Sequence, residues 1–537
     1  MTHQRKGSYG SVFVTSPIID SSEQVQYNQI PISTSSRSCD VKGKTQAKDL
    51  SYLIISGGTG ANSIASAFGN SPSFVLPVSD DGGSSSEILR CFGGPSIGDI
   101  RSRLIRLIPL AANPTTKDDT ERIAIYNLFA YRFPAEAAEK EVRELWHEIV
   151  EGRSDLWDGI GEDKKECIRA FLVHFQTLCL KRAHKRFSFR NFSLGNGFLT
   201  GARDLFGSLP SAIFLFKSIA GVNQGVQVIP VINTNQTVTI AAQLADTTVL
   251  VGQCNISHPT SPIDASSTSA TNNIESTSAT TVKANSTKLR NHFRRDSRTF
   301  DTPDTSLPAS RRTSFGQITE GQEGWSSAKG KSNANSNGGN LGYRKGEEET
   351  PLESKIERVF YINLYGQEIY PEPNSDFLES IDQRDLLVYS CGSLWTSIIP
   401  CLALKGLATF IAKSTSLKAK ILLLNSSNDR ETPDYAASEY ITTIINMLKH
   451  YDKPKRNNNS NNEQISNGQI EWKPSDLISH IVFLEGSKVE IDHDTVIQLG
   501  VKLVKVPAEI HNSAKNTIPL FTPECVEWAM DRVLDDV

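Results

Sequence analysis

The feature that most constrains the fold is a repeated succession of a short apolar segment, a polar or glycine-rich loop, and a helical pattern. Residues 51–56 read SYLIIS and are followed by glycines, and residues 73–79 read SFVLPVS and are followed by two aspartates. The segments LLVYSCGS at 386–393 and KAKILLLNS at 418–426 repeat the pattern. Short, wholly apolar runs are typical of strands buried on both faces. Strands alternating with helices predict an α/β fold with a mostly parallel sheet and helices on both faces.

Changes in composition divide the 537 residues into folded and polar parts. The hydrophobic share is 38% and the mean hydropathy is -0.31, which indicates a core diluted by polar segments. We predict a disordered arm at 1–48 and a disordered Ser/Thr/Asn-rich insertion at 256–353, because neither can bury enough apolar surface. The predicted core has a first part at 49–255, with a helical insertion at about 114–190, and a second part at 354–537, with a disordered loop at about 453–470. We expect both parts to build one sheet.

Bulk properties exclude several classes of protein. The net charge of -4 gives no overall attraction for nucleic acid. No run approaches the roughly 20 apolar residues of a membrane helix, and no secretory signal is evident at the N-terminus. The eight cysteines and ten histidines are dispersed, without a C-x-x-C pair or a metal-binding cluster. We therefore expect a soluble cytoplasmic protein with reduced thiols, and neither nucleic acid nor a membrane as a partner.

The first candidate motif is the glycine-rich loop between a predicted strand and a predicted helix at 61–68. It consists of Gly57, Gly58, Thr59 and Gly60. Glycines let the backbone approach an anion closely, and the N–H groups at the start of a helix attract phosphate. The spacing matches neither the dinucleotide fingerprint nor the Walker A loop. A tight turn without a ligand remains the alternative interpretation.

The second motif is the acidic turn that ends the next predicted strand. It consists of Asp80, Asp81, Gly82, Gly83, Ser84 and Ser85. In an open parallel sheet, ligands bind at the carboxyl ends of the strands. Two carboxylates at that edge could hold Mg²⁺ or orient a hydroxyl group, whereas a simple capping turn would need the same residue types.

Three further motifs also lie beside predicted helices. Gly98, Asp99 and Arg101 open one helix, where Arg101 could bind phosphate and Asp99 could be a cap. Gly195 and Asn196 open another. The third follows a predicted strand, and its members are Gly392, Ser393, Leu394, Trp395, Thr396 and Ser397. The indole of Trp395 could stack on a base or belong to the core. A sixth candidate follows the next predicted strand and consists of Asn425 with the loop from Asp429 to Thr432, which includes Glu431; a plain polar loop is its alternative.

In this order, the motifs resemble those of the CofD/YvcK-like family, which includes 2-phospho-L-lactate transferases and bacterial gluconeogenesis factors. The matching stretches are GGTG, DDGGSS, GDIR, NFSLGN and GSLWTSIIP. The second and the last of these, with YRF at 131–133, are closer to the gluconeogenesis factors. The resemblance covers both parts of the core. The Asn- and Ser-rich insertions favour a eukaryotic, fungal-type member.

The resemblance implies a Rossmann-like core that binds a nucleotide. In the transferases, a phospholactyl group passes from a guanosine diphospho-carrier to a deazaflavin alcohol with Mg²⁺, whereas gluconeogenesis factors bind a UDP-sugar and are regulatory. Carried over to this chain, residues 57–60 would face the diphosphate, and Asp80 and Asp81 would form the reactive or metal-binding edge. Ser393, Trp395 and Thr396 would form the wall around the nucleoside or sugar.

We therefore predict a nucleotide or nucleotide-sugar binding protein that regulates carbon or cell-wall metabolism. The alternative is a Mg²⁺-dependent transferase that moves a phosphorylated group from a UDP- or GDP-linked carrier, with Asp80 and Asp81 as catalytic residues. A dehydrogenase is disfavoured by the glycine register. The chain departs from the family pattern at Trp395, where a Tyr is usual, at Asn62, where an apolar residue is usual, and in the 256–353 insertion. A homodimer is a further expectation.

The insertion also contains two kinase-type sequences. Two arginines precede Ser297 in RRDS and two precede Ser314 in RRTS. Basophilic kinases favour such sites, so we predict that a protein kinase phosphorylates both serines and reverses the local positive charge. A solvated basic patch is the alternative.

Overall fold

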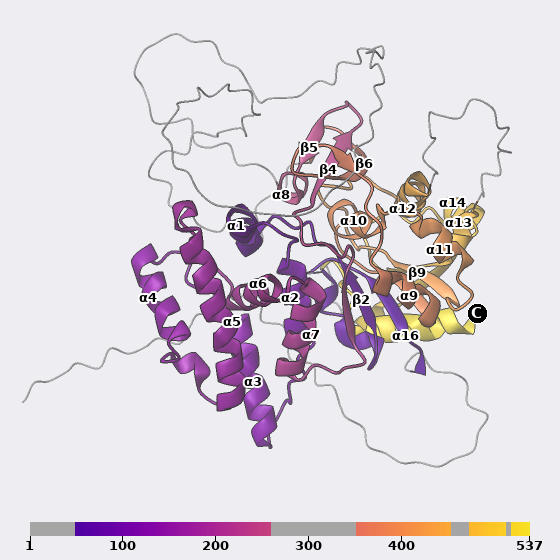
Figure 1. Ribbon diagram of the computed structural model, residues 1–537. Helices are drawn as coiled ribbons and strands as arrows, with labels where there is room; N and C mark the ends of the chain where they lie inside the picture. The colour runs from indigo at the N-terminus through magenta and orange to yellow at the C-terminus, as the bar shows by residue number, and fades with distance from the viewer. Residues whose placement is uncertain (1–48, 59, 259–350, 453–471, 512–516, 537) are drawn as a thin grey trace, which may run out of the picture.

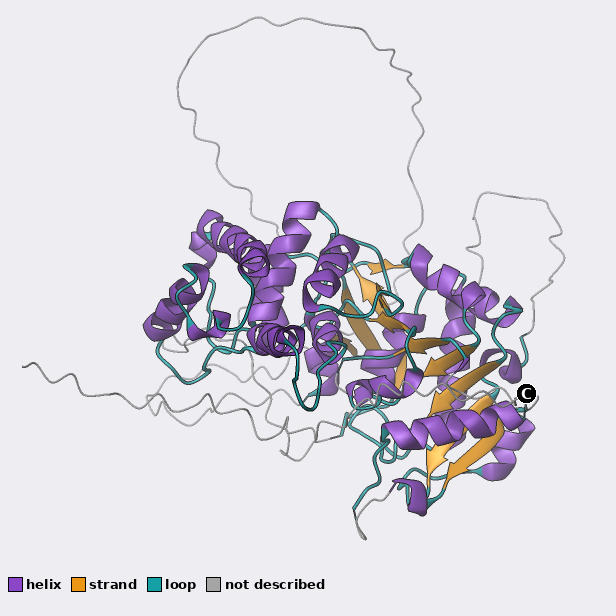
Figure 2. Ribbon diagram, turned by 90° about the horizontal axis from the view of Figure 1, so that it is seen from below, coloured by secondary structure: helices purple, strands orange, loops and turns teal. Residues whose placement is uncertain are grey.

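The computed structural model describes residues 49–58, 60–258, 351–452, 472–511 and 517–536. A seven-stranded sheet has the order β11-β10-β9-β8-β1-β2-β3, and every neighbouring pair is parallel. Its strands are β1 (Tyr52–Ile55), β2 (Ser73–Leu76), β3 (Gln227–Pro230), β8 (Leu386–Tyr389), β9 (Ala419–Leu423), β10 (His480–Leu484) and β11 (Lys502–Val506). Figure 2 shows strands, in orange, with helices packed around them. This confirms the predicted α/β class. The predicted arm at 1–48 and nearly all of the predicted polar inserts lie outside the described residues.

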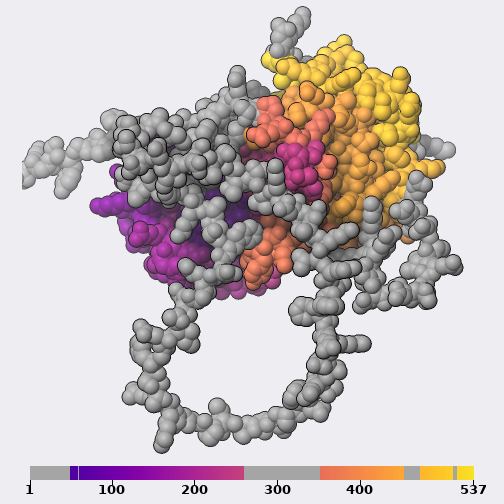
Figure 3. Space-filling view, turned by 90° about the horizontal axis from the view of Figure 1, so that it is seen from above, coloured from indigo at the N-terminus to yellow at the C-terminus, as the bar shows by residue number. Residues whose placement is uncertain are grey.

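The two parts of the chain share this sheet. Strand β1 pairs with β2 on one side and with β8 on the other, so the first and second parts meet at the centre. In the space-filling view, described residues of the first part, indigo to magenta, adjoin those of the second part, orange to yellow (Figure 3). Every residue of β1, β2, β8, β9 and β10 is buried, as expected for strands covered on both faces.

Alternate residues of each strand pack into different layers, because successive side chains point to opposite faces of a sheet. Tyr52 and Ile54 join the apolar cluster under α16 (Pro523–Asp535) and the 3₁₀ turn η3 (Ala65–Phe68). Leu53 and Ile55 join the larger cluster on the other face. The helices of that face are α2 (Gly98–Arg106), α6 (Leu194–Phe206), α7 (Leu209–Ala220), α9 (Ser375–Gln383), α11 (Leu407–Lys413), α12 (Ala437–Tyr451), α13 (Pro474–Leu477) and α14 (His493–Gln498).

The predicted helical insertion is confirmed as a group of helices beside the sheet (Figure 1). Its helices are α3 (Lys117–Ala130), α4 (Glu139–Val150) and α5 (Glu162–Lys181), with a short turn at Asp155–Trp157. An aromatic cluster fills its interior. Trp146 stacks on Phe189 with 4.6 Å between ring centroids, and Phe175 stacks on Phe192 at 5.4 Å. This packing joins the insertion to the start of α6.

A second, smaller sheet replaces part of the single sheet that the sequence predicted. It has the order β5-β4-β6-β7 and is antiparallel throughout. Its strands are β4 (Thr239–Leu244), β5 (Val249–Val251), β6 (Ile356–Ile362) and β7 (Glu368–Ile369). The link between β4 and β5 is too short for a parallel crossover, which needs about a dozen residues, so a hairpin forms instead.

The helix predicted at 61–68 is also wrong. Two 3₁₀ turns, η2 (Gly60–Asn62) and η3, occupy this stretch. The carbonyl of Ala61, which an α-helix would use for its own ladder, instead accepts a hydrogen bond from the Arg103 guanidinium at 2.9 Å. Consequently, no α-helix N-terminus follows the glycine loop directly.

None of the single helices in the described part of the chain is both long and apolar enough to cross a bilayer. The bent pair Leu394–Leu402 and Leu407–Lys413, which meet at 80°, passes such a test by length and composition. Their apolar side chains are mostly buried in the core of the fold.

Candidate functional site

The predicted motifs gather at the carboxyl edge of the central strands. The glycine loop follows β1, the acidic turn follows β2, and the loop at 390–393 follows β8. These three strands are adjacent and parallel, so their loops leave on the same side of the sheet. The remaining motifs form the first turns of α2 and α6.

The glycine loop is tightly enclosed by two other motifs. A Cβ on Gly57 would lie 2.4 Å from Ser397 Oγ, and a Cβ on Gly58 would lie 2.1 Å from Asp99 Oδ1. Neither glycine has a positive φ. Close approach, and not backbone conformation, therefore explains why side chains are absent from both positions.

The far end of the loop is closed by the β8 loop. A Cβ on Gly60 would lie 3.1 Å from the carbonyl oxygen of Cys391. Asn62 donates a 2.8 Å hydrogen bond from Nδ2 to Ser102 Oγ, which ties the segment to α2. Thr59 lies outside the described residues. The glycine loop therefore packs between the loop after β8 and helix α2.

Asp80 and Asp99 form a pair of neighbouring carboxyl groups. Asp80 accepts hydrogen bonds from the backbone N–H of Gly82 at 3.0 Å and from the Ser85 hydroxyl at 3.3 Å. A Cβ on Gly98 would lie only 2.7 Å from Asp80 Oδ2, so this glycine lets α2 approach the acid. Removal from water raises the pKa of both carboxyl groups, and Asp80 further raises the pKa of Asp99. The neighbouring Asp81 likewise raises the pKa of Asp80.

Asp81 makes its contacts near the second sheet, although its charge also raises the pKa of Asp80. Its Oδ1 accepts a 2.8 Å hydrogen bond from the backbone N–H of Cys254, in the first turn of α8 (Gln253–Ser257). A Cβ on Gly252 would lie 2.3 Å from Asp81 Oδ2. The sequence predicted one role for the adjacent aspartates; their hydrogen-bond partners differ, although both carboxyl groups raise the pKa of Cys254.

The first turn of α6 is fixed against two other motifs. Asn196 donates a 2.6 Å hydrogen bond from Nδ2 to Ser84 Oγ, in the first turn of α1 (Gly83–Phe92). A Cβ on Gly195 would lie 2.7 Å from the carbonyl oxygen of Phe129 and 3.1 Å from Arg101 Cγ. Both contacts bring α6 close to the acidic turn and to α2.

The β8 loop runs into the π-helical turn η6 (Leu394–Ile398) and then α10 (Ile399–Leu402). Leu394, Trp395 and Thr396 are buried, whereas Ser393 and Ser397 are half-buried. The indole of Trp395 therefore packs inside the fold. Gly392 is held by Asn425, whose Oδ1 accepts its N–H at 2.9 Å and whose Nδ2 donates to its carbonyl at 2.7 Å.

Glu431 is buried behind this turn. Its Oε2 accepts the backbone N–H groups of Trp395 and Thr396, both at 3.1 Å, and its Oε1 accepts the Thr396 hydroxyl at 2.5 Å. Burial raises the pKa of Glu431 to about 8, and Asp429 adds to the increase. The carboxyl group thus fixes the loop through its backbone.

Four residues that shape the site were not predicted from the sequence, namely Ser56, Arg103, Gly252 and Cys254. Arg103 could have been predicted from the sequence. It follows Asp99 by four residues, and residues four apart on a helix lie on the same face. Gly252 and Cys254 gave no signal, since they reach Asp81 only through the second sheet.

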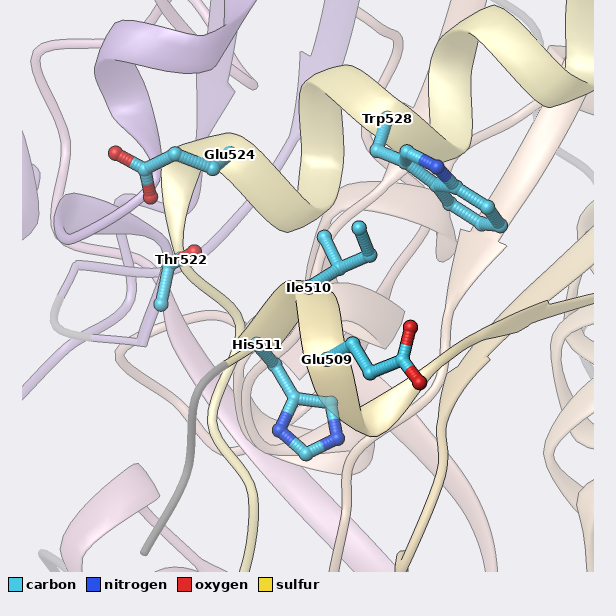
Figure 4. A pocket seen from close by; sticks show the side chains of 6 residues that line it. All are labelled: Glu509, Ile510, His511, Thr522, Glu524 and Trp528. Atoms are coloured by element: carbon cyan, nitrogen blue, oxygen red, sulfur yellow. The ribbon is translucent and has the colours of Figure 1, made fainter.

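A separate pocket of about 450 Å³ lies beside edge strand β11, between α15 (Ala508–His511) and α16. Figure 4 shows its lining side chains: Glu509, Ile510, His511, Thr522, Glu524 and Trp528. Its residues belong to neither the glycine loop nor the acidic turn. Among the described residues, no group of three or more His, Cys, Asp or Glu side chains is arranged to hold a metal ion.

A parallel sheet with helices on both faces, and with a glycine loop and carboxyl groups at its carboxyl edge, defines a Rossmann-like α/β protein. Residues 53–508 match the family model described as 2-phospho-L-lactate transferase CofD. The chain belongs to this family, which confirms the resemblance of the motifs.

Two relatives show how far the similarity extends. An uncharacterized protein of Saccharomyces cerevisiae is 34% identical over 458 residues, which cover 82% of this chain and 92% of that protein. The gluconeogenesis factor of Halalkalibacterium halodurans is 34% identical over 91 residues, 17% of this chain and 26% of that protein. A crystal structure of a UPF0052 family member from Bacillus halodurans aligns with a TM-score of 0.49 and 17% identity, and covers 90% of this chain and 99% of that one.

Proposed function

We propose that this chain binds a nucleotide or nucleotide sugar at the carboxyl edge of β1, β2 and β8. The observation that supports this most is the close packing of the motifs on one another. Ser397 lies next to Gly57, and Asp99 lies next to Gly58. The contacts join backbone, hydroxyl and carboxyl groups from distant parts of the chain at the edge where open α/β sheets bind ligands. The diphosphate lies against Gly57, Gly58 and Gly60 in this proposal.

The ligand class follows from the family. A UDP-sugar or a GDP-linked metabolite carries a diphosphate, the group that a side-chain-free loop accommodates. The stretch of similarity to a gluconeogenesis factor supports a regulatory role in carbon or cell-wall metabolism, with the bound nucleotide as the signal.

In our proposal, Mg²⁺ would be held by Asp80 and Asp99, and not by the adjacent pair Asp80 and Asp81. Mg²⁺ is commonly held by one or two carboxylates together with ligand phosphates and water. Asp80 and Asp99 supply two neighbouring carboxyl groups beside the glycine loop, whereas both oxygens of Asp81 face the turn before α8. In this proposal Asp80 and Asp99 hold the ion, which neutralises charge on the diphosphate.

The same pair supports the second candidate, a transferase that moves a phosphorylated group from the nucleotide carrier. Carboxyl groups with raised pKa values are suited to accept or hold a proton near neutral pH. In such a reaction, Asp80 or Asp99 would hold the proton of the acceptor hydroxyl.

Calorimetry with the full chain tests the binding proposal. UDP-N-acetylglucosamine, UDP and GDP are titrated with and without Mg²⁺, and small molecules that co-purify are identified by mass spectrometry. We expect saturable binding of at least one diphosphate. If none of these ligands binds and none co-purifies, the proposal is wrong. Product formation from a bound donor with Mg²⁺ would favour the transferase over the sensor.

A further inference from the structure

We propose that Arg103 is the positive centre of the glycine loop and also sets its shape. This inference rests on the proposed binding function and assigns the residue that attracts the diphosphate. Arg103 acts from behind the loop, so it is a positioning residue and not a catalytic one.

The guanidinium of Arg103 joins the two ends of the loop. Its Nη2 donates a 3.1 Å hydrogen bond to Ser56 Oγ, directly before Gly57. Its Nη1 donates a 2.9 Å hydrogen bond to the carbonyl of Ala61, directly after Gly60. One planar group with a fixed fork of donors therefore sets the distance between the ends of the loop.

Arg103 is a buried charge on which Asp99 acts electrostatically without a direct ion pair. The side chain of Arg103 has an exposed fraction of 0% and lies over the Phe74 ring at 4.5 Å. Both of its hydrogen bonds go to uncharged oxygens, and no ion pair joins it to another described residue. Burial lowers the pKa of Arg103 to about 10, so it stays charged at neutral pH.

A buried charge without an ionic partner is costly, so its presence needs a physical reason. An anionic ligand on the opposite side of the loop provides one, because attraction between charges is strong where water is excluded. The neighbouring Asp99 contributes only part of the balance, since it also faces Asp80.

The local backbone makes this role necessary. Phosphate loops normally rely on the N–H groups and dipole of the helix that follows. Here the following turn η2 has three residues, too few for an appreciable helix dipole. The charge of Arg103 replaces that contribution from a different helix, α2.

The test compares ligands of increasing charge on two Arg103 variants. Arg103→Met keeps the length but removes the charge, and Arg103→Lys keeps the charge but removes the fork. Affinities of the nucleoside, its monophosphate and its diphosphate are measured by calorimetry at low and high salt. We expect Arg103→Met to weaken binding of the diphosphate at least tenfold. Binding of the monophosphate should weaken by a smaller factor, and binding of the neutral nucleoside by less than twofold. We expect Arg103→Lys to keep diphosphate affinity within about fivefold.

Arg203→Met is the matched control. Arg203 is also buried, and it donates from Nη1 to the carbonyl of Pro95 and from Nη2 to that of Gly93, away from the glycine loop. Arg203→Met should be less stable than the wild type. Any change in its affinity should be the same for the nucleoside, the monophosphate and the diphosphate. Thermal melting of each variant establishes that it is folded before titration.

The outcomes separate this inference from the proposed function. A wild-type chain that binds no diphosphate overturns both. A folded Arg103→Met variant that binds the diphosphate as the wild type does, or that loses all three ligands equally, overturns the role of Arg103 alone. If the Met variant does not fold, Arg103→Lys tests the inference instead. The inference is wrong if this variant binds the diphosphate more than thirtyfold more weakly than the wild type and still binds the nucleoside normally.

Discussion

The Thr396 hydroxyl donates a 2.5 Å hydrogen bond to the buried carboxyl group of Glu431, whose other oxygen accepts the N–H groups of Trp395 and Thr396. These are the N–H groups that open the π-helical turn after β8. Because Glu431 already occupies them, this turn cannot offer them to a phosphate. In our proposal the anion is bound by the glycine loop after β1 and not by this turn.

Glu431 should be essential to the stability of the β8 loop. Glu431→Ala leaves two buried N–H groups and one hydroxyl without an acceptor, and we expect it to lower the free energy of unfolding by about 2–4 kcal/mol. Glu431→Gln keeps one carbonyl oxygen for the N–H groups and should cost less than about 1 kcal/mol. Urea unfolding at pH 6 measures both. An alanine variant as stable as the wild type would contradict the assignment.

Glu431 should also make stability depend on pH. The folded chain keeps this proton up to about pH 8, whereas an unfolded Glu releases it near its ordinary pKa of about 4.3. The folded state therefore binds more protons between these values, and its stability decreases as pH rises from 5 to 8. The stability of Glu431→Gln should decrease less steeply with rising pH than that of the wild type, with a difference in slope of up to about 1.4 kcal/mol per pH unit. Exposed Glu379→Gln is the control, and its profile should parallel that of the wild type.

The close approach of Gly57 to Ser397 can be tested by compensation. Gly57→Ala should weaken nucleotide binding at least tenfold, because its Cβ would lie 2.4 Å from Ser397 Oγ and push the loop from the β8 turn. Adding Ser397→Gly removes the obstructing side chain and should restore part of the affinity. Calorimetry on the two single variants and the double variant gives the coupling energy. Purely additive effects would show that this contact does not shape the site.

The aspartates should separate into two functions. Asp80→Asn and Asp99→Asn should reduce the enhancement of nucleotide binding by Mg²⁺ by roughly 10–100-fold, while neither should destabilise the fold strongly, since each removes one of two repelling carboxyl groups. Asp81→Asn should keep the Mg²⁺ effect and lower the melting temperature, because Asp81 supports the first turn of α8. Equal loss of the Mg²⁺ effect in all three variants would contradict this division.

Phosphorylation is predicted at Ser297 and Ser314, which lie outside the described residues. Both follow a pair of arginines, so modification would replace local positive charge by negative charge. Phosphopeptide mapping of the protein from growing cells should detect both sites. Alanine variants at both positions serve as the control, and two serines that are unmodified under all growth conditions would refute the prediction.

Much of the sheet could be predicted from short apolar runs. SYLIIS, SFVLPVS and KAKILLLNS correspond to β1, β2 and β9, since burial on both faces demands apolar residues throughout. The pairing of β4 with β6 could not be predicted, because residues 245–355 separate them along the chain. The segment at 61–68 showed a helical pattern, but it forms 3₁₀ turns, and the carbonyl of Ala61 accepts a hydrogen bond from Arg103, which is far along the chain.

The sequence by itself determined the class of fold and the order of the motifs, because apolar periodicity and glycine placement are local properties of the chain. Only the tertiary structure decided which groups meet: Asp80 lies near Asp99 as well as its neighbour Asp81, and Arg103 binds both ends of the glycine loop. Adjacent side chains after a strand point in different directions, whereas residues far apart meet when parallel strands align their loops. The chemistry of the proposed site therefore depends on contacts that the motifs do not specify one by one.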